Sequence, residues 1–241
     1  MIYLALGDSI TYGYDATDEH NRYPSVLAHR LREFGRTSLY VHAKPGWTSE
    51  KLLQSLEQIP HAIIEEASLI TLMIGGNDLL HAMPWFLDDP QKAKQRFSGA
   101  FRSRILAIIR RIKRNPDAFF LICTVYNPFP KAEIANEAVA WLNEMLQDIA
   151  RSEQCLLVPV HHSYDGAQDR LVQGYKNGDL SDFRLMRNPI HPNDEGHRQI
   201  ASVLFDYYQR YLKERQAKDA KIRQRNGISA KKRRDKRSMR V

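Results

Sequence analysis

Ser9 is the residue of this chain that is placed to act as a nucleophile. It comes directly after a short apolar run, residues 2–6, within the sequence Gly-Asp-Ser-Ile-Thr at residues 7–11. The glycine permits a tight turn from a strand into a helix, which would present the serine at the end of the strand. Because a serine hydroxyl attacks a carbonyl only after a base has taken its proton, the prediction depends on finding a histidine.

His191 is the histidine that we predict to be this base. It lies in the loop at residues 188–197, Asn-Pro-Ile-His-Pro-Asn-Asp-Glu-Gly-His, between two prolines and just before the last expected helix. Several other histidines lie in or beside expected helices and strands, where packing accounts for them: His29, His61, His161 and His162. A single histidine is more often structural than catalytic, so His191 gains weight only from the residues that accompany it.

Acyl transfer also needs hydrogen-bond donors for the negative charge that develops on the carbonyl oxygen. Asn77 follows the apolar run 68–74 in a Gly-Gly-Asn-Asp turn and offers a side-chain N–H. Gly46 follows the run 38–42 and offers a backbone N–H with no Cβ beside it, and the N–H of Ser9 itself is the third candidate donor. Each piece alone is weak, since such a turn is usually only a turn. Their order along the chain favours a serine ester hydrolase.

Two acidic residues, Asp8 and Asp78, stand next to these candidates, and we expect both to be structural. Asp8 would bond backbone N–H groups of its own turn, and Asp78 would brace the turn that carries Asn77. No histidine or cysteine at metal-ligand spacing accompanies them, so we predict no metal site and no cofactor.

Five short apolar runs are predicted to be strands of a buried parallel sheet, because they lack polar alternation: residues 2–6, 38–42, 68–74, 118–123 and 155–160. Between them lie expected helices with apolar stripes at helical spacing, at residues 23–34, 48–58, 97–113, 131–150 and 193–212. This alternation predicts one three-layer α/β domain with right-handed crossovers. In such a domain the site lies beyond the carboxyl ends of the strands, where the candidate residues stand.

The order Gly-Asp-Ser, then a glycine, then Gly-x-Asn-Asp, then His-Pro resembles that of the SGNH (GDSL-type) hydrolases. The resemblance covers residues 1–212 and is similar in particular to bacterial GDSL lipase/acylhydrolases, including spore germination lipases of the Bacillus type. It implies a flavodoxin-like α/β/α fold with a five-stranded parallel sheet, no metal, and functional roles for Ser9, Gly46, Asn77 and His191. It also implies that Ser9 forms an acyl-enzyme, which a water activated by His191 then hydrolyses.

The sequence departs from the family pattern at residue 188. The pattern places an aspartate three residues before the histidine to hold its ring, and here that position is Asn188, which we keep as an atypical third member. In a serine protease the equivalent change lowers turnover about 10⁴-fold. Three alternatives follow. Another group, such as a main-chain carbonyl, Asp182 or Asp194, supports His191; or Ser9 and His191 act as a dyad; or the enzyme is weakened or inactive.

The basic charge of the chain is concentrated at its end. The net charge is +8, but residues 213–241 hold 13 Lys/Arg against three Asp/Glu, which leaves a net −2 on the other residues. We expect this segment to be a disordered tail or to extend the last helix only partway. A solvated tail is the plain interpretation. The functional one is binding to an anionic membrane surface or to nucleic acid, so a weakened hydrolase that binds through its tail is the alternative outside enzymology.

The sequence gives little information about the substrate. Aromatic residues after the expected strands either line an acyl pocket or pack in ordinary loops, with neither interpretation favoured: Trp47, Trp85, Phe86 and the aromatic residues of 126–129. Residues 78–97 form the longest insertion near the site and are a candidate lid. A lid favours lipid or simple carboxylic esters as substrates, and deacetylation of a carbohydrate is the alternative within the class. We infer no obligate protein partner.

Composition and cysteine usage suggest a cytoplasmic protein. The 241 residues, 43% hydrophobic and 27% charged, are ordinary for a globular protein, and no run approaches the ~20 apolar residues that span a bilayer. The start of the sequence lacks the basic and apolar regions of a signal peptide. Cys123 and Cys155 occupy apolar, strand-like positions, so we expect buried thiols rather than a disulfide.

Overall fold

A five-stranded parallel sheet organises the chain in a computed structural model that describes residues 1–183 and 188–238, with side chains to residue 218 and at Lys221. The strands are β1 (Ile2–Gly7), β2 (Ser38–Ala43), β3 (Ala67–Met73), β4 (Phe119–Cys123) and β5 (Leu156–Val158). Every pairing is parallel, and the spatial order is β2-β1-β3-β4-β5. The five expected strands and the doubly wound α/β fold are thus confirmed.

The strand order places a crevice between β1 and β3. The chain leaves β1 toward β2 on one side and then returns to β3 on the other, so the order reverses between these two strands. In open parallel sheets, ligands bind beyond the carboxyl ends of the strands at such a reversal. Ser9 follows β1 and Asn77 lies shortly after β3, so both stand at this point.

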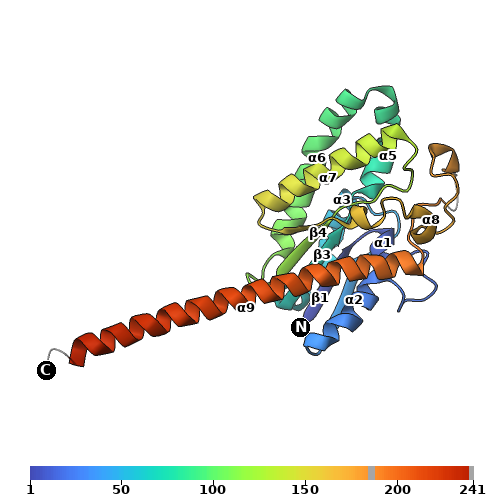
Figure 1. Ribbon diagram of the computed structural model, residues 1–241. Helices are drawn as coiled ribbons and strands as arrows, with labels where there is room; N and C mark the ends of the chain where they lie inside the picture. The colour runs from blue at the N-terminus through green and yellow to red at the C-terminus, as the bar shows by residue number, and fades with distance from the viewer. Residues whose placement is uncertain (184–187, 239–241) are drawn as a thin grey trace. The chain divides into compact units, whose positions relative to one another are not determined.

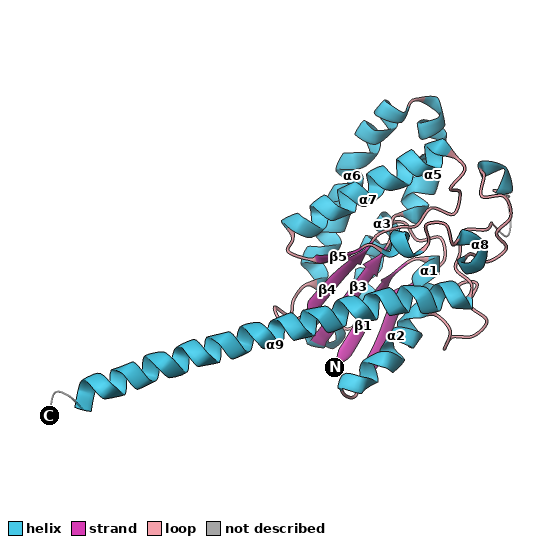
Figure 2. Ribbon diagram, viewed as in Figure 1, coloured by secondary structure: helices cyan, strands magenta, loops and turns pink. Residues whose placement is uncertain are grey.

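Helices cover both faces of the sheet (Figure 2). Along the chain they are α1 (Ser9–Tyr12), α2 (Tyr23–Leu31), α3 (Ser49–Ser55), α4 (His61–Glu66), α5 (Gly76–Asp88), α6 (Pro90–Ile112), α7 (Glu133–Ser152), α8 (Gln168–Leu171) and α9 (Asp194–Ser238). Helices α5, α6 and α7 pack against one another, and α3 packs against α6, on one side of the strands (Figure 1). Helix α2 lies on the other side. Burial of apolar side chains between these layers is the main stabilising contribution to the fold.

The segment at residues 78–97, which the sequence suggested as a lid, is helical. It contains most of α5 and the beginning of α6. The break between the two helices is at Asp89, whose carboxylate accepts hydrogen bonds from the N–H groups of Gln91 and Lys92, both at 3.1 Å. Pro90 occupies the first position of α6, where its missing N–H costs nothing. None of the helices expected from the sequence covers residues 78–96, and a role of this segment as a lid stays a prediction.

The chain divides into two compact units, Met1–Val203 and Leu204–Val241, and α9 runs from the first into the second. The backbone of the basic segment is helical as far as Ser238, whereas the sequence predicted disorder or a helix that stops partway. Residues 213–238 contain no proline and are rich in lysine, arginine, glutamine and alanine, which are good helix formers. The last three residues of the predicted tail, 239–241, lie outside the described residues, and the proposed domain boundary at residue 212 stays a prediction.

Candidate active site

Ser9 begins the short helix α1 directly beyond the end of β1. Asp8 caps this helix, because its carboxylate accepts a hydrogen bond from the N–H of Ile10 at 3.0 Å. This is the structural role that the sequence predicted for Asp8. Burial, with a smaller contribution from the charge of Asp78, raises the pKa of Asp8 to about 7. The cap fixes the backbone that carries Ser9, whose side chain is buried but faces a pocket.

His191 meets Ser9 across the carboxyl edge of the sheet. Its Nε2 lies 2.9 Å from the Ser9 Oγ, so the hydroxyl can donate to the ring. Burial lowers the pKa of His191 below its usual value, against an opposing contribution from a neighbouring carboxylate. A neutral imidazole with Nε2 facing a serine hydroxyl is the arrangement that a general base requires.

Hydrogen bonds to two other segments, residues 171–173 and Tyr126, hold the loop that carries His191. The His191 carbonyl accepts from the N–H of Gln173 at 2.8 Å, and the N–H of Asn193 donates to the Leu171 carbonyl at 3.0 Å. The Tyr126 hydroxyl donates to the carbonyl of Ile190 at 2.6 Å. The loop is therefore fixed on both sides of the histidine, which accounts for the position of an imidazole outside any helix or strand.

The carboxylate beside the other ring nitrogen belongs to Asp15. Its Oδ2 lies 3.1 Å from the His191 Nδ1. The sequence names Asn188 as an atypical third member and leaves open that another group supports His191; the group at hydrogen-bond distance from Nδ1 is Asp15, a residue that the sequence analysis does not name. The Asn188 carbonyl accepts instead from the N–H of Ile190 at 2.9 Å.

The other two carboxylates that the sequence suggested have different partners. Asp182 accepts hydrogen bonds from the backbone N–H groups of Asn177 and Gly178, both at 2.7 Å. Asp194 accepts from the N–H and the hydroxyl of Thr17, at 2.9 and 2.6 Å. Each of them therefore stabilises a loop, and the carboxylate beside the Nδ1 of His191 is that of Asp15.

A turn after α1 brings Asp15 back to the site. Gly13 ends the helix with φ at +87°, in the left-handed region, and its N–H donates to the Ser9 carbonyl at 3.0 Å. The N–H of Tyr14 donates to the same carbonyl, so the chain reverses close to Ser9. The signal in the sequence was a glycine two residues before an acidic residue, shortly after the nucleophile. This signal does not identify Asp15 from the sequence, because the family pattern points to residues close to the histidine.

Asn77, one of the predicted oxyanion donors, lines the same pocket as Ser9 and His191. Its Nδ2 donates one hydrogen bond to the Trp47 carbonyl at 2.9 Å, and an amide NH₂ group carries a second N–H. Gly46 precedes Trp47 and has φ at +78°. A Cβ added at Gly46 would meet nothing within 4 Å, so the backbone conformation, not lack of space, explains the glycine. Gly46 does not line the pocket itself and is connected to it through the bond between Asn77 and Trp47.

Asp78 acts over a longer range than the sequence suggested. Its carboxylate accepts from the N–H and the hydroxyl of Ser49 at 2.8 and 2.5 Å, across 29 residues of sequence. It thereby ties the beginning of α5, which carries Asn77, to the beginning of α3, which follows Gly46. Among the side chains that the structure describes, no cluster of three or more histidine, cysteine or acidic residues is arranged to hold a metal ion.

An apolar pocket of about 370 Å³ opens beside Ser9. Its walls come from α5, the segment after β4, α7, the segment at residues 180–183 and the loop of His191. The apolar wall residues include Leu79, Met83, Leu87, Val125, Phe129, Ala135, Val139, Leu180 and Ile190. The predicted segment 126–129 does line the pocket. Trp47, Trp85 and Phe86 do not: Trp47 lies against His42, Trp85 lies under the guanidinium of Arg96, and Phe86 packs on Trp141.

Comparisons with known proteins show the family and the fold of the chain. The family model for the GDSL-like lipases/acylhydrolases matches residues 5–199. The chain is 26% identical over 219 residues to the spore germination lipase LipC of Bacillus licheniformis, covering 84% of this chain and 93% of that protein. The crystal structure of the lipase Lip_vut3 from a goat rumen metagenome superposes with a TM-score of 0.70 at 20% identity, covering 85% of this chain and 95% of the other. Phospholipase A1 from Streptomyces albidoflavus gives a TM-score of 0.66 at 19% identity, covering 84% and 97%.

Proposed function

The chain belongs to the GDSL-like lipase/acylhydrolase family and is a carboxylic ester hydrolase, and we propose that it works through an acyl-enzyme formed on Ser9. The 2.9 Å contact between the Ser9 Oγ and the His191 Nε2 carries this proposal. In the first step the Oγ bonds to the ester carbonyl carbon while its proton passes to Nε2. The carbonyl oxygen becomes an oxyanion, which the backbone N–H of Ser9, the backbone N–H of Gly46 and the Nδ2 of Asn77 stabilise.

The remaining steps return the protein to its starting state. His191 gives the proton to the departing alkoxide oxygen, so the alcohol leaves and Ser9 keeps the acyl group. A water molecule then loses a proton to Nε2 and attacks the acyl carbon, and the Oγ recovers that proton as the acid is released. No residue changes oxidation state, and the sum of the steps is one ester and one water giving one acid and one alcohol.

Labelling of Ser9 tests the proposal directly. A fluorophosphonate probe should react with the full chain at Ser9, as mapped by peptide mass spectrometry, and p-nitrophenyl esters should be hydrolysed. Ser9→Ala should lose both activities, whereas Ser103→Ala, an exposed position on α6, should keep them. Neither labelling nor turnover on any ester of the panel would contradict the proposal.

The shape and lining of the pocket favour esters with an extended acyl chain over acetylated carbohydrates. The wall residues beside Ser9 are mainly leucine, valine, isoleucine, methionine and phenylalanine, which bury methylene groups favourably, at about 0.8 kcal/mol for each. A sugar hydroxyl would find few partners on such a wall. We therefore propose lipid or simple acyl esters as substrates, and hydrolysis of acetyl groups alone would favour carbohydrate deacetylation instead.

Filling the pocket tests this choice of substrate. Ala135 on α7 is buried and lines the pocket, while Ala140 on the same helix is exposed. Ala135→Leu should lower kcat/KM for eight- and ten-carbon acyl esters by about tenfold, with acetyl esters little changed, because the added methylene groups occupy the space of the distal chain. The matched variant Ala140→Leu should leave the chain-length profile as it is. An Ala135→Leu profile parallel to that of the wild type would exclude this pocket as the acyl site.

We further propose that residues 213–241 attract the enzyme to an anionic lipid surface. Support comes from the charge, 13 Lys/Arg against three Asp/Glu. Full-length protein should bind vesicles that contain phosphatidylserine, more weakly at high salt, and replacing residues 231–234 by glutamine should reduce that binding. Tail-dependent binding to RNA without binding to vesicles would assign the segment to nucleic acid, and binding to neither would leave it a solvated helix.

A cytoplasmic location is part of the same proposal. No described helix is both long enough and apolar enough to cross a membrane. Cys123 is buried, Cys155 is half-buried, and both are free thiols, as expected for a reducing compartment. Cell fractionation with an antibody to the protein distinguishes the cytoplasm from a secreted location.

A further inference from the structure

We propose that Asp15 is the residue that positions His191, in place of the acidic residue that the family pattern has three positions before the histidine. The inference rests on the proposed function, since His191 needs support only if it is the base for Ser9. In the family pattern the acidic residue lies in the loop of the histidine. Here, we propose, it lies in the turn that follows the nucleophile. Asn188, at the usual position, has no negative charge to offer.

The contact has the geometry that this role requires. The Asp15 Oδ2 lies 3.1 Å from the Nδ1 of His191, and the opposite ring nitrogen is the one that faces Ser9. A carboxylate on Nδ1 keeps the proton on that nitrogen, so Nε2 stays unprotonated and accepts the proton of the serine. It also stabilises the imidazolium ion that forms after the transfer. The side chain of His191 is 14% exposed and that of Asp15 is 32% exposed, so the contact is partly shielded from water.

The neighbouring residue Tyr14 covers the ring on another side. Its ring centroid lies 4.8 Å from that of His191 at an angle of 46°. Tyr14 and Asp15 together therefore fix both the plane and the rotation of the imidazole. Gly13 permits the turn that brings Tyr14 and Asp15 to the ring. Its backbone is in the left-handed region, and an added Cβ would lie 2.5 Å from the Arg22 Cβ.

A second set of hydrogen bonds holds the segment after Asp15 in place. Asp194, in the first turn of α9, accepts from the N–H and the hydroxyl of Thr17 and, at 3.1 Å, from the Nδ2 of Asn21. Asp194 is three residues beyond His191 in the chain. The segment that carries Asp15 and the segment that carries His191 are thus joined at two points, so the short contact between them does not depend on one exposed side chain alone.

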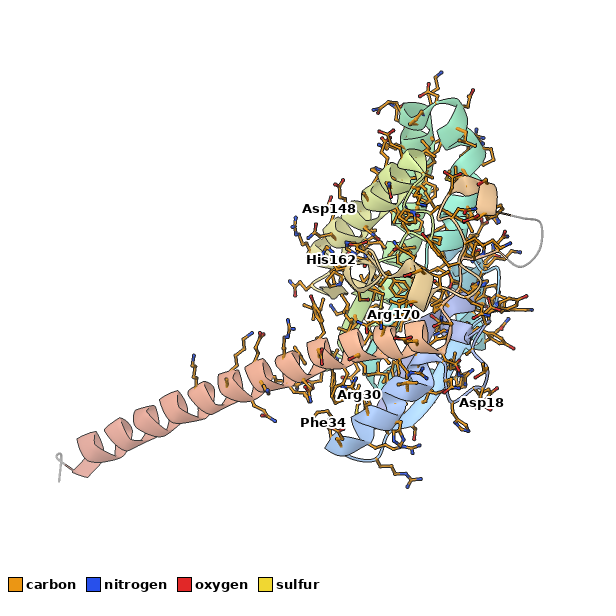
Figure 3. All side chains as sticks on the ribbon, turned by 45° about the vertical axis from the view of Figure 1, so that its right-hand side comes forward. Asp18, Arg30, Phe34, Asp148, His162 and Arg170 are labelled. Carbon is orange, nitrogen blue, oxygen red and sulfur yellow. The ribbon has the colours of Figure 1, made fainter. Side chains whose placement is uncertain are left out.

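Asp18 offers a matched control in the same loop. It is an exposed carboxylate that accepts from the N–H of His20 at 2.7 Å and lies at the outer surface of the protein (Figure 3). Asp15→Asn and Asp18→Asn make the same chemical change, three residues apart. Each keeps a side-chain oxygen that can accept a hydrogen bond, so both variants should fold, as checked by thermal unfolding.

The experiment measures kcat, KM and the rate of fluorophosphonate labelling for the full-length protein and both variants. Asp15→Asn should lower kcat and the labelling rate by roughly 10²- to 10⁴-fold with KM changed by less than about threefold. Asp18→Asn should stay within about twofold of the wild type. Asp15→Asn activity within about threefold of the wild type, or an equal loss in both variants, would overturn the inference.

The pH profile separates positioning from a general loss of structure. Besides Asp15, the titratable groups of the described residues that face His191 include Tyr14 on its ring, His197 and, in the lining of the same pocket, Asp8 and Tyr126. The Asp15 carboxylate raises the pKa of His191, against the larger lowering by burial, so its removal should move the acid limb of kcat/KM to lower pH. An acid limb that does not move would also overturn the inference. Failure of the proposed function would look different, because the wild-type protein itself would then be neither labelled at Ser9 nor active.

Discussion

Ser49 donates two hydrogen bonds to Asp78, one from its backbone N–H at 2.8 Å and one from its hydroxyl at 2.5 Å. Both residues are buried; Ser49 begins α3, shortly after Gly46, and Asp78 lies in the first turn of α5, next to Asn77. The pair joins the loop after β2 to the loop after β3. The distance between the Gly46 and Asn77 donors therefore depends on a contact that contains neither of them.

Asp78→Asn tests this dependence. The amide has one oxygen to accept from the two Ser49 donors, and its NH₂ group would face the other donor, so we expect a loss of about 2 kcal/mol in the free energy of unfolding. Because the oxyanion donors would move apart, kcat should also fall by about tenfold with KM little changed. Urea unfolding and steady-state kinetics measure the two effects. A variant that loses stability but keeps the wild-type kcat would show that the pair is structural only.

Asn77→Ala should damage the transition state more than substrate binding. Removal of one side-chain donor from an oxyanion hole costs about 10²- to 10³-fold in kcat in a subtilisin-type enzyme. We expect a loss of that size here, with KM within about threefold. The variant also loses the bond to the Trp47 carbonyl, so Asn77→Asp, which cannot donate, is the second variant. If both variants keep more than a tenth of the wild-type kcat, Asn77 is not an oxyanion donor.

Asn188→Asp should change little while Asp15 is present. The Asp15 Oδ2 already lies 3.1 Å from the His191 Nδ1, so a carboxylate at residue 188 is not needed to hold the ring. We expect kcat within about threefold of the wild type, measured on the preferred p-nitrophenyl ester. A large loss would show that the amide of Asn188 is itself needed, and a large gain would show that Asp15 supports the histidine poorly.

The sequence predicted which residues lie together at the strand ends better than it predicted the contacts between them. Ser9 and His191 were identified because the chemistry of a serine nucleophile limits the candidate partners and because the strand ends of a parallel sheet meet at one edge. The five strands followed from their apolar runs, which have few alternatives in an α/β domain. These predictions depend on local composition and on rules of topology, both of which a sequence displays.

Asp15 was missed because its role depends on a turn. Gly13 suggests a turn before Asp15, but it does not mark Asp15 as a neighbour of His191, 176 residues later. The link appears only when the left-handed turn at Gly13 and the hydrogen bonds between Thr17 and Asp194 are known. The sequence predicts the later part of α6 at residues 97–113 but not α5 or the beginning of α6, because an aspartate followed by a proline, as at Asp89 and Pro90, is also common in loops.

His197 should make the stability of the protein depend on pH. It is fully buried, its Nδ1 accepts from the N–H of Tyr23 at 3.3 Å, and its Nε2 has no hydrogen-bond partner among the described residues. Burial lowers the pKa of His197 to about 4, whereas in the unfolded chain it would be about 6.5. As the pH falls from about 6.5 toward 4, the unfolded chain takes up the proton first. The contribution of neutral His197 to the free energy of unfolding is therefore lost over that range, by up to roughly 3 kcal/mol.

The titration of Asp8 has the opposite effect on the free energy of unfolding over part of the same pH range. The pH dependence of the wild-type stability therefore does not isolate the contribution of His197. The pKa of Asp8 is about 7 in the folded protein, which means that the folded state takes up this proton first and is stabilised as the pH falls. The difference in stability between the wild type and His197→Asn cancels the contribution of Asp8, because Asp8 is present in both proteins. The variant keeps an acceptor near the Nδ1 position and should be less stable than the wild type at pH 7, with the difference shrinking toward pH 4. Parallel urea-unfolding curves from pH 7 to pH 4 would show that His197 is not held neutral.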